Sequence, residues 1–174
     1  MPDPALPDPA LPETGPRRDP FHPADDAGRR LARGLLDGAR SAALAYADAA
    51  GPGISRIAFG LGPEQVPLTL ISSLSAHFAA LHANPCCAVM LGEPADKGDP
   101  LNHPRLMLRA RAEFLPRSDH HTLRTHWLHQ HPKSALYIDF ADFAFVRLHP
   151  ISAVLNAGFG RAMRLTAADL RPKK

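Results

Sequence analysis

Residues 67–85 read PLTLISSLSAHFAALHANP, and this stretch decides the fold. Its LTLI segment is apolar and partly β-branched, which is typical of a buried strand. Ser72 and Ser73 end the strand, and Ser75 stands at the N-cap of a helix that Pro85 stops. A strand that runs through a serine-rich turn into a helix offers hydroxyls and free backbone N–H groups to an anion. We therefore predict the phosphate end of a cofactor site at this turn.

Short strands and short helices surround this segment. Strands are predicted at 41–48 and 54–61, which with the central one form an antiparallel meander. Further strands are predicted at 86–91, 105–116, 141–148 and 151–155, and helices after Asp25 and over 118–131. Because closure removes exposed strand edges, these elements predict a mainly β, α+β fold. We expect an antiparallel split β-barrel with a few short peripheral helices.

Length and composition fit one domain behind a proline-rich leader. The chain has 174 residues, of which 45% are hydrophobic and 21% charged, which is sufficient for a single core. Residues 1–23 carry proline every few positions and contain PDPAL twice, so we predict a disordered or polyproline-like leader. The folded domain is expected over residues 24–174.

Charge, cysteine content and hydropathy argue against several classes of protein. The formal net charge is +3 and the basic residues are scattered, which argues against nucleic-acid partners. Cys86 and Cys87 are adjacent, and strand neighbours point to opposite faces, so we expect reduced thiols. No stretch reaches the roughly 20 apolar residues that span a bilayer, and the N-terminus lacks the order of a signal peptide. We predict a cytoplasmic protein without a membrane partner.

Arg56 is the strongest single candidate for a ligand contact on residue type alone. It stands inside an apolar strand, and a buried or half-buried arginine needs an anionic partner, for which a cofactor phosphate would serve. The alternatives are a structural ion pair or an exposed strand face. In the simpler interpretation the turn serines only shape the turn, and His77 is a surface histidine.

The histidines between His120 and His131 do not predict a metal site. His126 and His129 would share a helix face, but no carboxylate or cysteine stands at ligand spacing to complete a tetrahedral set. Asp142 begins a strand and has two interpretations, a place in a dimer cleft near a bound macrocycle or a hydrogen bond to backbone. No catalytic group is named, because neither cysteine has a base at readable spacing.

Several segments, taken together, resemble the flavin-binding split-barrel proteins related to pyridoxamine 5'-phosphate oxidase. In chain order they are ISRIAFG (54–60), LTLISSLSAHFAALHANPCCAVML (68–91), GDPLNHPRLMLRARAEFL (98–115), HPKSALYIDFADFAFVRL (131–148) and AGFGRA (157–162). The GDPLNHPRL segment, the DFAFVRL strand and the GFGRA ending resemble in particular the branch that contains haem-utilisation proteins.

The resemblance implies FMN, a set of site residues and an oligomeric state. In the family an arginine on the second strand and hydroxyl and basic groups of the strand-to-helix turn hold the FMN phosphate. The matching residues here are Arg56, Ser72, Ser73, Ser75 and His77. Arg105 is the next candidate, since its strand's family counterpart can face the flavin. The family also implies a homodimer with the cofactor between the subunits.

The chain differs from both branches of the family at informative positions. It has Ala76 and His77 where the oxidases carry a basic pair after the turn serine, and it lacks their Arg- and Trp-containing C-terminal segment. The haem-utilisation relatives use a histidine in a C-terminal tail as axial ligand, whereas no histidine follows His149 here.

Three functions follow as hypotheses. The leading one is an FMN-binding flavoprotein, an oxidoreductase acting on an unknown small molecule through the flavin. The second is haem binding with oxidative cleavage of the ring, with His77, His82 or His103 as ligand. The third is a non-catalytic split barrel that binds a ligand or partner, which the weakened basic pair after Ser75 favours.

Overall fold

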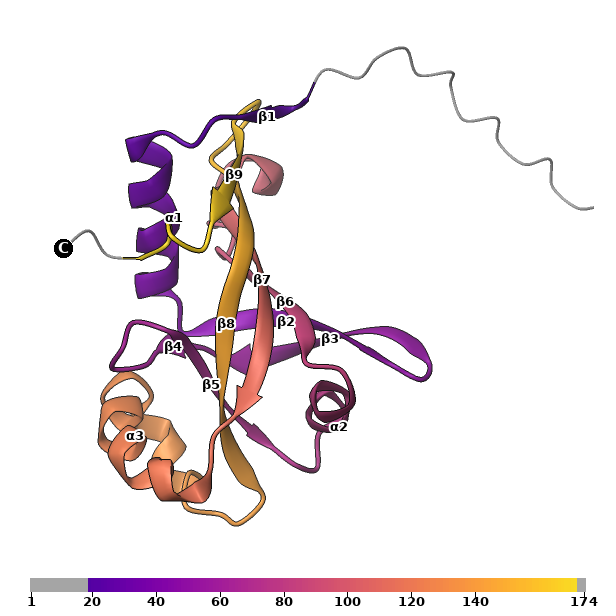
Figure 1. Ribbon diagram of the computed structural model, residues 1–174. Coiled ribbons are helices and arrows are strands. Elements are labelled where there is room, and N and C mark those ends of the chain that lie inside the picture. The colour runs from indigo at the N-terminus through magenta and orange to yellow at the C-terminus, as the bar shows by residue number, and fades with distance from the viewer. Residues whose placement is uncertain (1–18, 172–174) are drawn as a thin grey trace, which may run out of the picture.

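The computed structural model describes residues 19–171, and a nine-stranded sheet forms its centre (Figure 1). The main path of the sheet runs β1-β9-β8-β7-β6-β2-β3, while β5 pairs with β8 and β4 pairs with β5. Only the β1–β9 pair is parallel within this part of the chain. The strands are β1 (Phe21–His22), β2 (Ser41–Asp48), β3 (Gly51–Ala58), β4 (Gly60–Leu61), β5 (Pro67–Ser72), β6 (Cys86–Leu91), β7 (Arg105–Phe114), β8 (Phe143–Asn156) and β9 (Ala162–Thr166).

Three α-helices lie around this sheet, so the expected α+β architecture is confirmed. They are α1 (Asp26–Gly38), α2 (Ala76–Ala83) and α3 (Arg117–Gln130), with short 3-10 helices at Pro100–Asn102 and Pro132–Leu136. Asp25 caps α1 by accepting a hydrogen bond from the Gly28 N–H at 2.6 Å. Ser75 occupies the N-cap of α2 as predicted, but its hydroxyl makes no cap hydrogen bond.

The longest strand, β8, corrects the prediction of two strands at 141–148 and 151–155. It runs for 14 residues through Pro150. Its register with β7 shifts between Arg109 and Ala110, which pair with Ser152 and Pro150, so that Ile151 has no partner. Proline cannot donate to a strand ladder, and a bulge is a place that accommodates it.

The expected three-stranded meander is correct only for its first hairpin. Strands β2 and β3 pair over all eight residues of each. Phe59, whose side chain is fully buried, then separates β3 from β4, and β5 pairs with β4 and β8 instead of β3. One edge of β8 pairs with β7, whereas the other pairs first with β5 and later with β9, which splits the barrel.

The main sheet has a buried inner face and an exposed outer face. The alternation predicted for RLMLRARAEFL is confirmed, since the even-numbered residues Leu106 and Leu108 are buried and the odd-numbered Arg109 and Arg111 are exposed. Helix α1 covers the inner face with Ala32 and Leu36. A second core cluster lies beneath α3 around Trp127 and Phe145.

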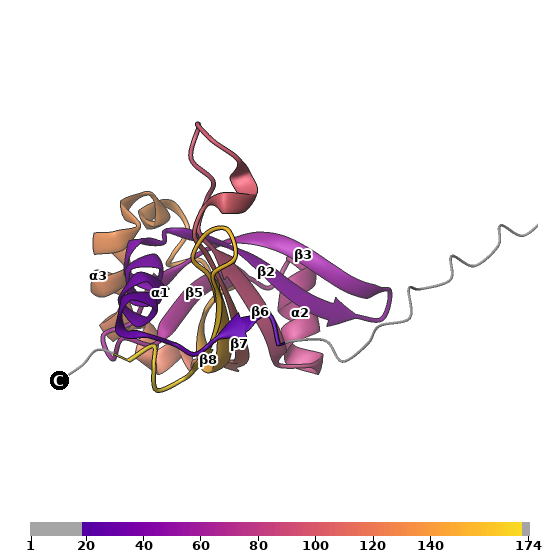
Figure 2. The ribbon, with the colours of Figure 1, turned by 90° about the horizontal axis from the view of Figure 1, so that it is seen from above.

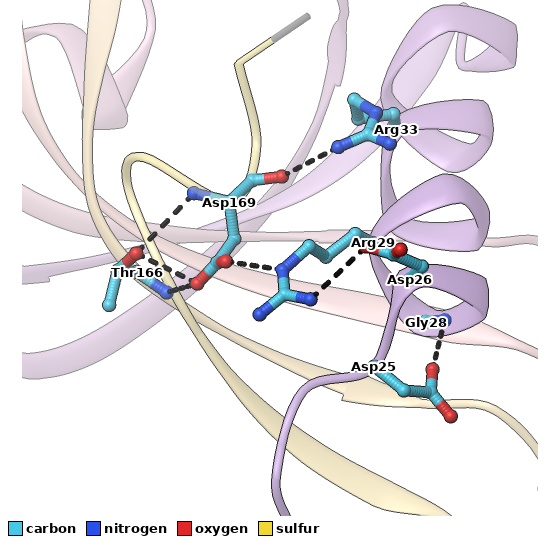
Figure 3. Close-up of polar contacts among 7 residues, drawn as sticks. All are labelled: Asp25, Asp26, Gly28, Arg29, Arg33, Thr166 and Asp169. Atoms are coloured by element: carbon cyan, nitrogen blue, oxygen red, sulfur yellow. Dashed lines mark hydrogen bonds and ion pairs between the residues drawn. The ribbon is translucent and has the colours of Figure 1, made fainter. Parts of the chain in front are cut away.

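A polar clasp joins α1 to the C-terminal turn (Figure 3). The Asp169 carboxylate accepts from Arg29 Nε at 2.6 Å and from the Thr166 N–H and hydroxyl at 2.8 Å. Arg33 Nη1 donates to the Asp169 carbonyl at 3.0 Å. The Arg29 guanidinium and the Thr166 donors lower the pKa of Asp169 from 3.8 to about 2.

Two regions at the periphery bear on the site. Residues 1–18 of the predicted leader lie outside the described residues, while Phe21 and His22 pair with β9. The loop between β6 and β7 rises away from the sheet (Figure 2). Gly92 at its base has a φ of 99°, and a Cβ there would lie 2.4 Å from the Pro104 carbonyl oxygen, so both ends of the loop approach closely only with glycine.

Candidate functional site

The turn from Ser72 to His77, where the phosphate was predicted to bind, contains a carboxylate and is called the serine corner below. Ser72 Oγ donates to Asp142 Oδ2 at 2.5 Å, and the Ser73 N–H donates to the Asp142 carbonyl at 2.7 Å. Asp142 is half-buried and lies 70 residues further along the chain. A negative group inside the corner repels a phosphate dianion, because like charges at close range disfavour each other's ionised forms.

Ser75 and His77 are also engaged with their own turn. Ser75 Oγ donates its only proton to the Ser72 carbonyl at 2.6 Å, so its contact of 3.1 Å with His77 requires the imidazole Nε2 to be the donor. Burial lowers the pKa of His77. A neutral imidazole and a satisfied hydroxyl therefore occupy the place where a phosphate-binding cation was expected.

Arg56 does not converge with this corner within one chain. It pairs with Ala43 across β2–β3, so the two side chains share a face, and Arg56 is exposed. Tyr46 is three residues from Ala43 and points to the opposite face, where the His77 ring lies at a centroid distance of 6.0 Å. The structure thus brings the serines and His77 together and leaves Arg56 on the outer face.

Arg105, the remaining predicted site residue, lies on that outer face beside a cleft. The cleft has a volume of about 280 Å³ and lies over β1, β6, β7, β8 and β9. Arg105 Nη1 donates to the Leu101 carbonyl at 2.8 Å, which uses one of its five N–H groups. The cleft is lined by Phe21, Met90, Arg105, Met107, Val154, Asn156 and Ala162.

The outer face around this cleft is apolar and continuous across the sheet. The pairing registers place Ala43, Met90, Met107 and Val154 in one row on neighbouring strands, with Arg56 at one end and Arg164 at the other. Neighbouring strands are about 5 Å apart, so the four apolar side chains cover about 15 Å. Met90 is 50% exposed. Ile54, which precedes Arg56 by two residues in β3 and so lies on the same face, is 76% exposed.

Most of the arginines on this face carry unneutralised charge. Among residues 19–171, the side chains of Arg56, Arg109 and Arg111 make no hydrogen bond or ion pair, and that of Arg105 makes no ion pair. Arg164 differs, because it pairs with Asp19 at 2.6 Å and lies over the Phe21 ring. An apolar surface with free guanidinium groups at its sides suits an amphipathic anion.

The histidines proposed as haem ligands lie elsewhere or are engaged. His82 stacks on Phe114 at 3.8 Å. His103 Nδ1 accepts the Ala95 N–H at 2.9 Å, so in the neutral ring Nε2 carries the proton and has no free lone pair. No group of three His, Cys, Asp or Glu residues that could hold a metal ion occurs within the described part of the chain.

Sequence reasoning missed the two features that matter most here. The carboxylate of Asp142 enters the serine corner only through the pairing of β5 with β8, which no local pattern reveals. The cross-strand pair of Met90 and Met107 depends on the β6–β7 register. Strand alternation did predict that Met107 shares a face with Arg105.

Comparison with known proteins identifies the fold of this chain. No family model matches the chain. A solved structure with 39% sequence identity superposes with a TM-score of 0.80 over 87% of this chain and 100% of its own. A putative pyridoxamine 5'-phosphate oxidase from Listeria innocua, 13% identical, superposes with a TM-score of 0.59 over 75% of this chain and 98% of that one. The chain has the split-barrel fold of pyridoxamine 5'-phosphate oxidase-like proteins.

Two of the proteins similar to this chain carry haem in their names. The chloroplastic heme oxygenase HOZ of Arabidopsis thaliana is 31% identical over 114 residues, which are 63% of this chain and 34% of that protein. A heme binding protein from Mycobacterium smegmatis has 23% identity and a TM-score of 0.75, over 84% of this chain and 61% of that one. The chain therefore spans about a third of the length of its curated relative. No helix within residues 19–171 is long and apolar enough to cross a membrane.

Proposed function

We propose that this split barrel binds haem, with the outer-face cleft as the binding surface. The observation that carries the proposal is the position of Met107, which lies in an apolar row and has the unpaired Arg105 and Arg109 two residues away on either side of it on β7. Haem combines a broad apolar ring with two carboxylates at one edge. The names of the Arabidopsis and mycobacterial relatives also support haem as the ligand class.

The residues present fit this ligand in both polarity and charge. Met90, Met107 and Val154 would contact the ring, since burial of apolar surface is the main driving force for such a ligand. Arg105 and Arg109 would bind the carboxylates, because a guanidinium pairs with a carboxylate through two parallel hydrogen bonds. Bound haem supplies iron-centred redox chemistry. The chain supplies the apolar surface, the charges and the partial exclusion of water.

FMN, which the sequence favoured, fits this chain less well. Asp142 accepts the Ser72 proton, and Ser75 gives its proton to the backbone, so neither hydroxyl is free to donate to a phosphate. Arg56 lies on the other face of the β2–β3 hairpin from His77. FMN remains the second candidate, because members of the same fold family bind it.

We also propose that two copies associate through the outer face, with the cofactor between them. The support is the exposed apolar surface formed by Ile54 and Met90, which is unusual for a surface in contact with water alone. Two-fold association of this kind is the commonest oligomeric arrangement.

The experiment is a parallel titration of the full chain with haem and with FMN. Haem binding shifts the Soret band, whereas FMN binding changes flavin fluorescence and the visible flavin spectrum. We expect a saturable Soret shift at micromolar haem and a weaker or absent flavin response. An unchanged Soret band at micromolar haem overturns the proposal, and saturable FMN binding with no haem response restores the flavin hypothesis.

A second stage asks whether the haem is degraded. The haem complex is incubated with an electron donor in air, and the Soret absorbance and free iron are measured. Loss of the Soret band together with iron release supports an activity of the kind named for the Arabidopsis relative, a heme oxygenase. A stable complex supports haem binding without degradation.

A further inference from the structure

The outer-face cleft offers no imidazole to a haem iron. None of the seven residues lining it is a histidine. His103, in the loop that leads into β7, has its Nδ1 lone pair occupied by the Ala95 N–H. His22 does not line the cleft, because it follows Phe21 in β1 and neighbouring strand residues point to opposite faces; its Nε2 donates to the Gly160 carbonyl at 3.0 Å.

Few other lone pairs are available in the cleft. The Asn156 side-chain oxygen accepts the Gly158 N–H at 3.0 Å. The guanidinium group of Arg105 has no lone pair to give. Apart from these, the side chains are the hydrocarbons of Phe21, Val154 and Ala162. The two methionines therefore hold the uncommitted donor atoms of the lining.

Met90 and Met107 also have the right placement for such a role. They are direct partners in the β6–β7 register, so their thioethers rise side by side from the same face of the sheet. Met90 is 50% exposed, which is unusual for a residue that normally fills cores. Methionine side chains are unbranched and adaptable, and their soft sulfur is a known axial donor to haem iron.

We propose that a thioether of the Met90–Met107 pair is the axial protein ligand of the haem iron, an assignment that rests on the proposed haem binding. The flanking Arg105 and Arg109 place positive charge beside the sulfur, where it favours the less positive ferrous iron.

The experiment uses conservative variants read by spectroscopy and not by activity. Met90→Leu, Met107→Leu and the double variant keep side-chain volume while removing the sulfur. Met163→Leu is the matched control, because Met163 is 2% exposed on the inner face. Each protein is loaded with haem, and the ferric spectrum is examined for the sulfur-to-iron charge-transfer band at its red end and by X-ray absorption for an iron–sulfur distance.

The expected result is that wild type and Met163→Leu show the sulfur signature and the double variant loses it while still shifting the Soret band. Loss in one single variant identifies the ligand, and loss only in the double variant means that either sulfur serves. We also expect Met107→His to give an imidazole-type spectrum, since the position faces the iron. The midpoint potential should fall in the Met107→His variant, because thioether ligation raises the potential relative to imidazole.

The outcomes distinguish a failure of the proposed haem binding from a failure of the methionine assignment. If wild type gives no Soret shift, the proposed haem binding fails and the ligand assignment fails with it. If wild type binds haem but the double variant keeps the same spectrum, the methionine assignment alone is wrong. A spectrum that changes instead in His22→Ala, His103→Ala or Cys86→Ser assigns the ligand to that residue and overturns the proposal.

Discussion

The charges beside Met107 are the residue-scale feature with the clearest consequence. Arg105 and Arg109 flank it on the exposed face of β7, and neither has an ion pair within residues 19–171. We expect Arg105→Gln with Arg109→Gln to weaken haem binding by about tenfold to a hundredfold, since each charge-assisted contact contributes about 1.5–3 kcal/mol before screening. The measurement is a haem titration at two salt concentrations.

A matched control for these arginines is available on another element. Arg124 makes a two-pronged pair with Asp139 on the α3 side of the molecule. Arg124→Gln therefore removes one positive charge without touching the outer face, and its effect is compared with that of each single variant, Arg105→Gln and Arg109→Gln. Equal weakening by both sets of variants would mean that net charge, and not the cleft, governs the affinity.

Asp142 carries the residue-scale prediction for the flavin alternative. Asp142→Asn removes the negative charge from the Ser72 corner and keeps the shape of the side chain. We expect FMN affinity to rise at least severalfold and haem affinity to stay unchanged. Asp139→Asn serves as the control, and fluorescence titration is the measurement. An unchanged FMN affinity would show that this carboxylate does not determine the cofactor.

These residues also mark the limit of what the sequence predicts about the site. The alternation of β7 placed Arg105 on the outward face correctly. Ser72 and Ser75 belong to the strand-to-helix turn as expected, but hydroxyls have no fixed partner until tertiary structure supplies one. A contact between residues 70 positions apart depends on strand pairing, which residue type does not encode.

At the scale of elements, the clasp between α1 and the C-terminal turn gives a pH-dependent prediction. Because the pKa of Asp169 is lowered from 3.8 to about 2, the ionised carboxylate stabilises the folded state fully above the ordinary value. That stabilisation is lost as the pH falls through about 4 toward 2. Asp169→Asn should cost about 1 kcal/mol at neutral pH and flatten the acid limb of the stability curve.

The measurement for the clasp is thermal or urea unfolding between pH 2 and 7. Asp26→Asn is a suitable comparison, because Asp26 lies on α1 together with Arg29 and the ion pair between these two residues is longer, at 3.4 Å. If Asp26→Asn and Asp169→Asn change the acid limb equally, the clasp is not the source of the effect.

Most elements were predictable, and the errors have identifiable causes. The bounds expected for β2 and β6 match because each is a short run ended by turn residues or a helix stop. Pro150 suggested a break, yet β8 continues because the bulge opposite Arg109 and Ala110 removes the need for its N–H. The order of pairing around β5 is a property of closure and has no local signal.

At the scale of the whole molecule, the exposed outer face gives the prediction about assembly. Ile54→Asp places a charge in the proposed interface, and Leu136→Asp does the same at an equally exposed site on the second 3-10 helix, where Ile54 and Leu136 are 76% and 79% exposed. We expect sedimentation to show a dimer for wild type and Leu136→Asp and a monomer for Ile54→Asp. A monomeric wild type at micromolar concentration rules out the dimer.

Strand β8 contributes side chains to both hydrophobic core clusters. It contributes Leu148 and Leu155 to one core cluster and Phe145 to the other, while pairing with β5, β7 and β9. Because β8 packs into both core clusters, we expect the two halves of the barrel to unfold together with this strand. Amide hydrogens at its centre should therefore exchange with solvent only when the entire domain opens, and those of both halves should do so at one common rate.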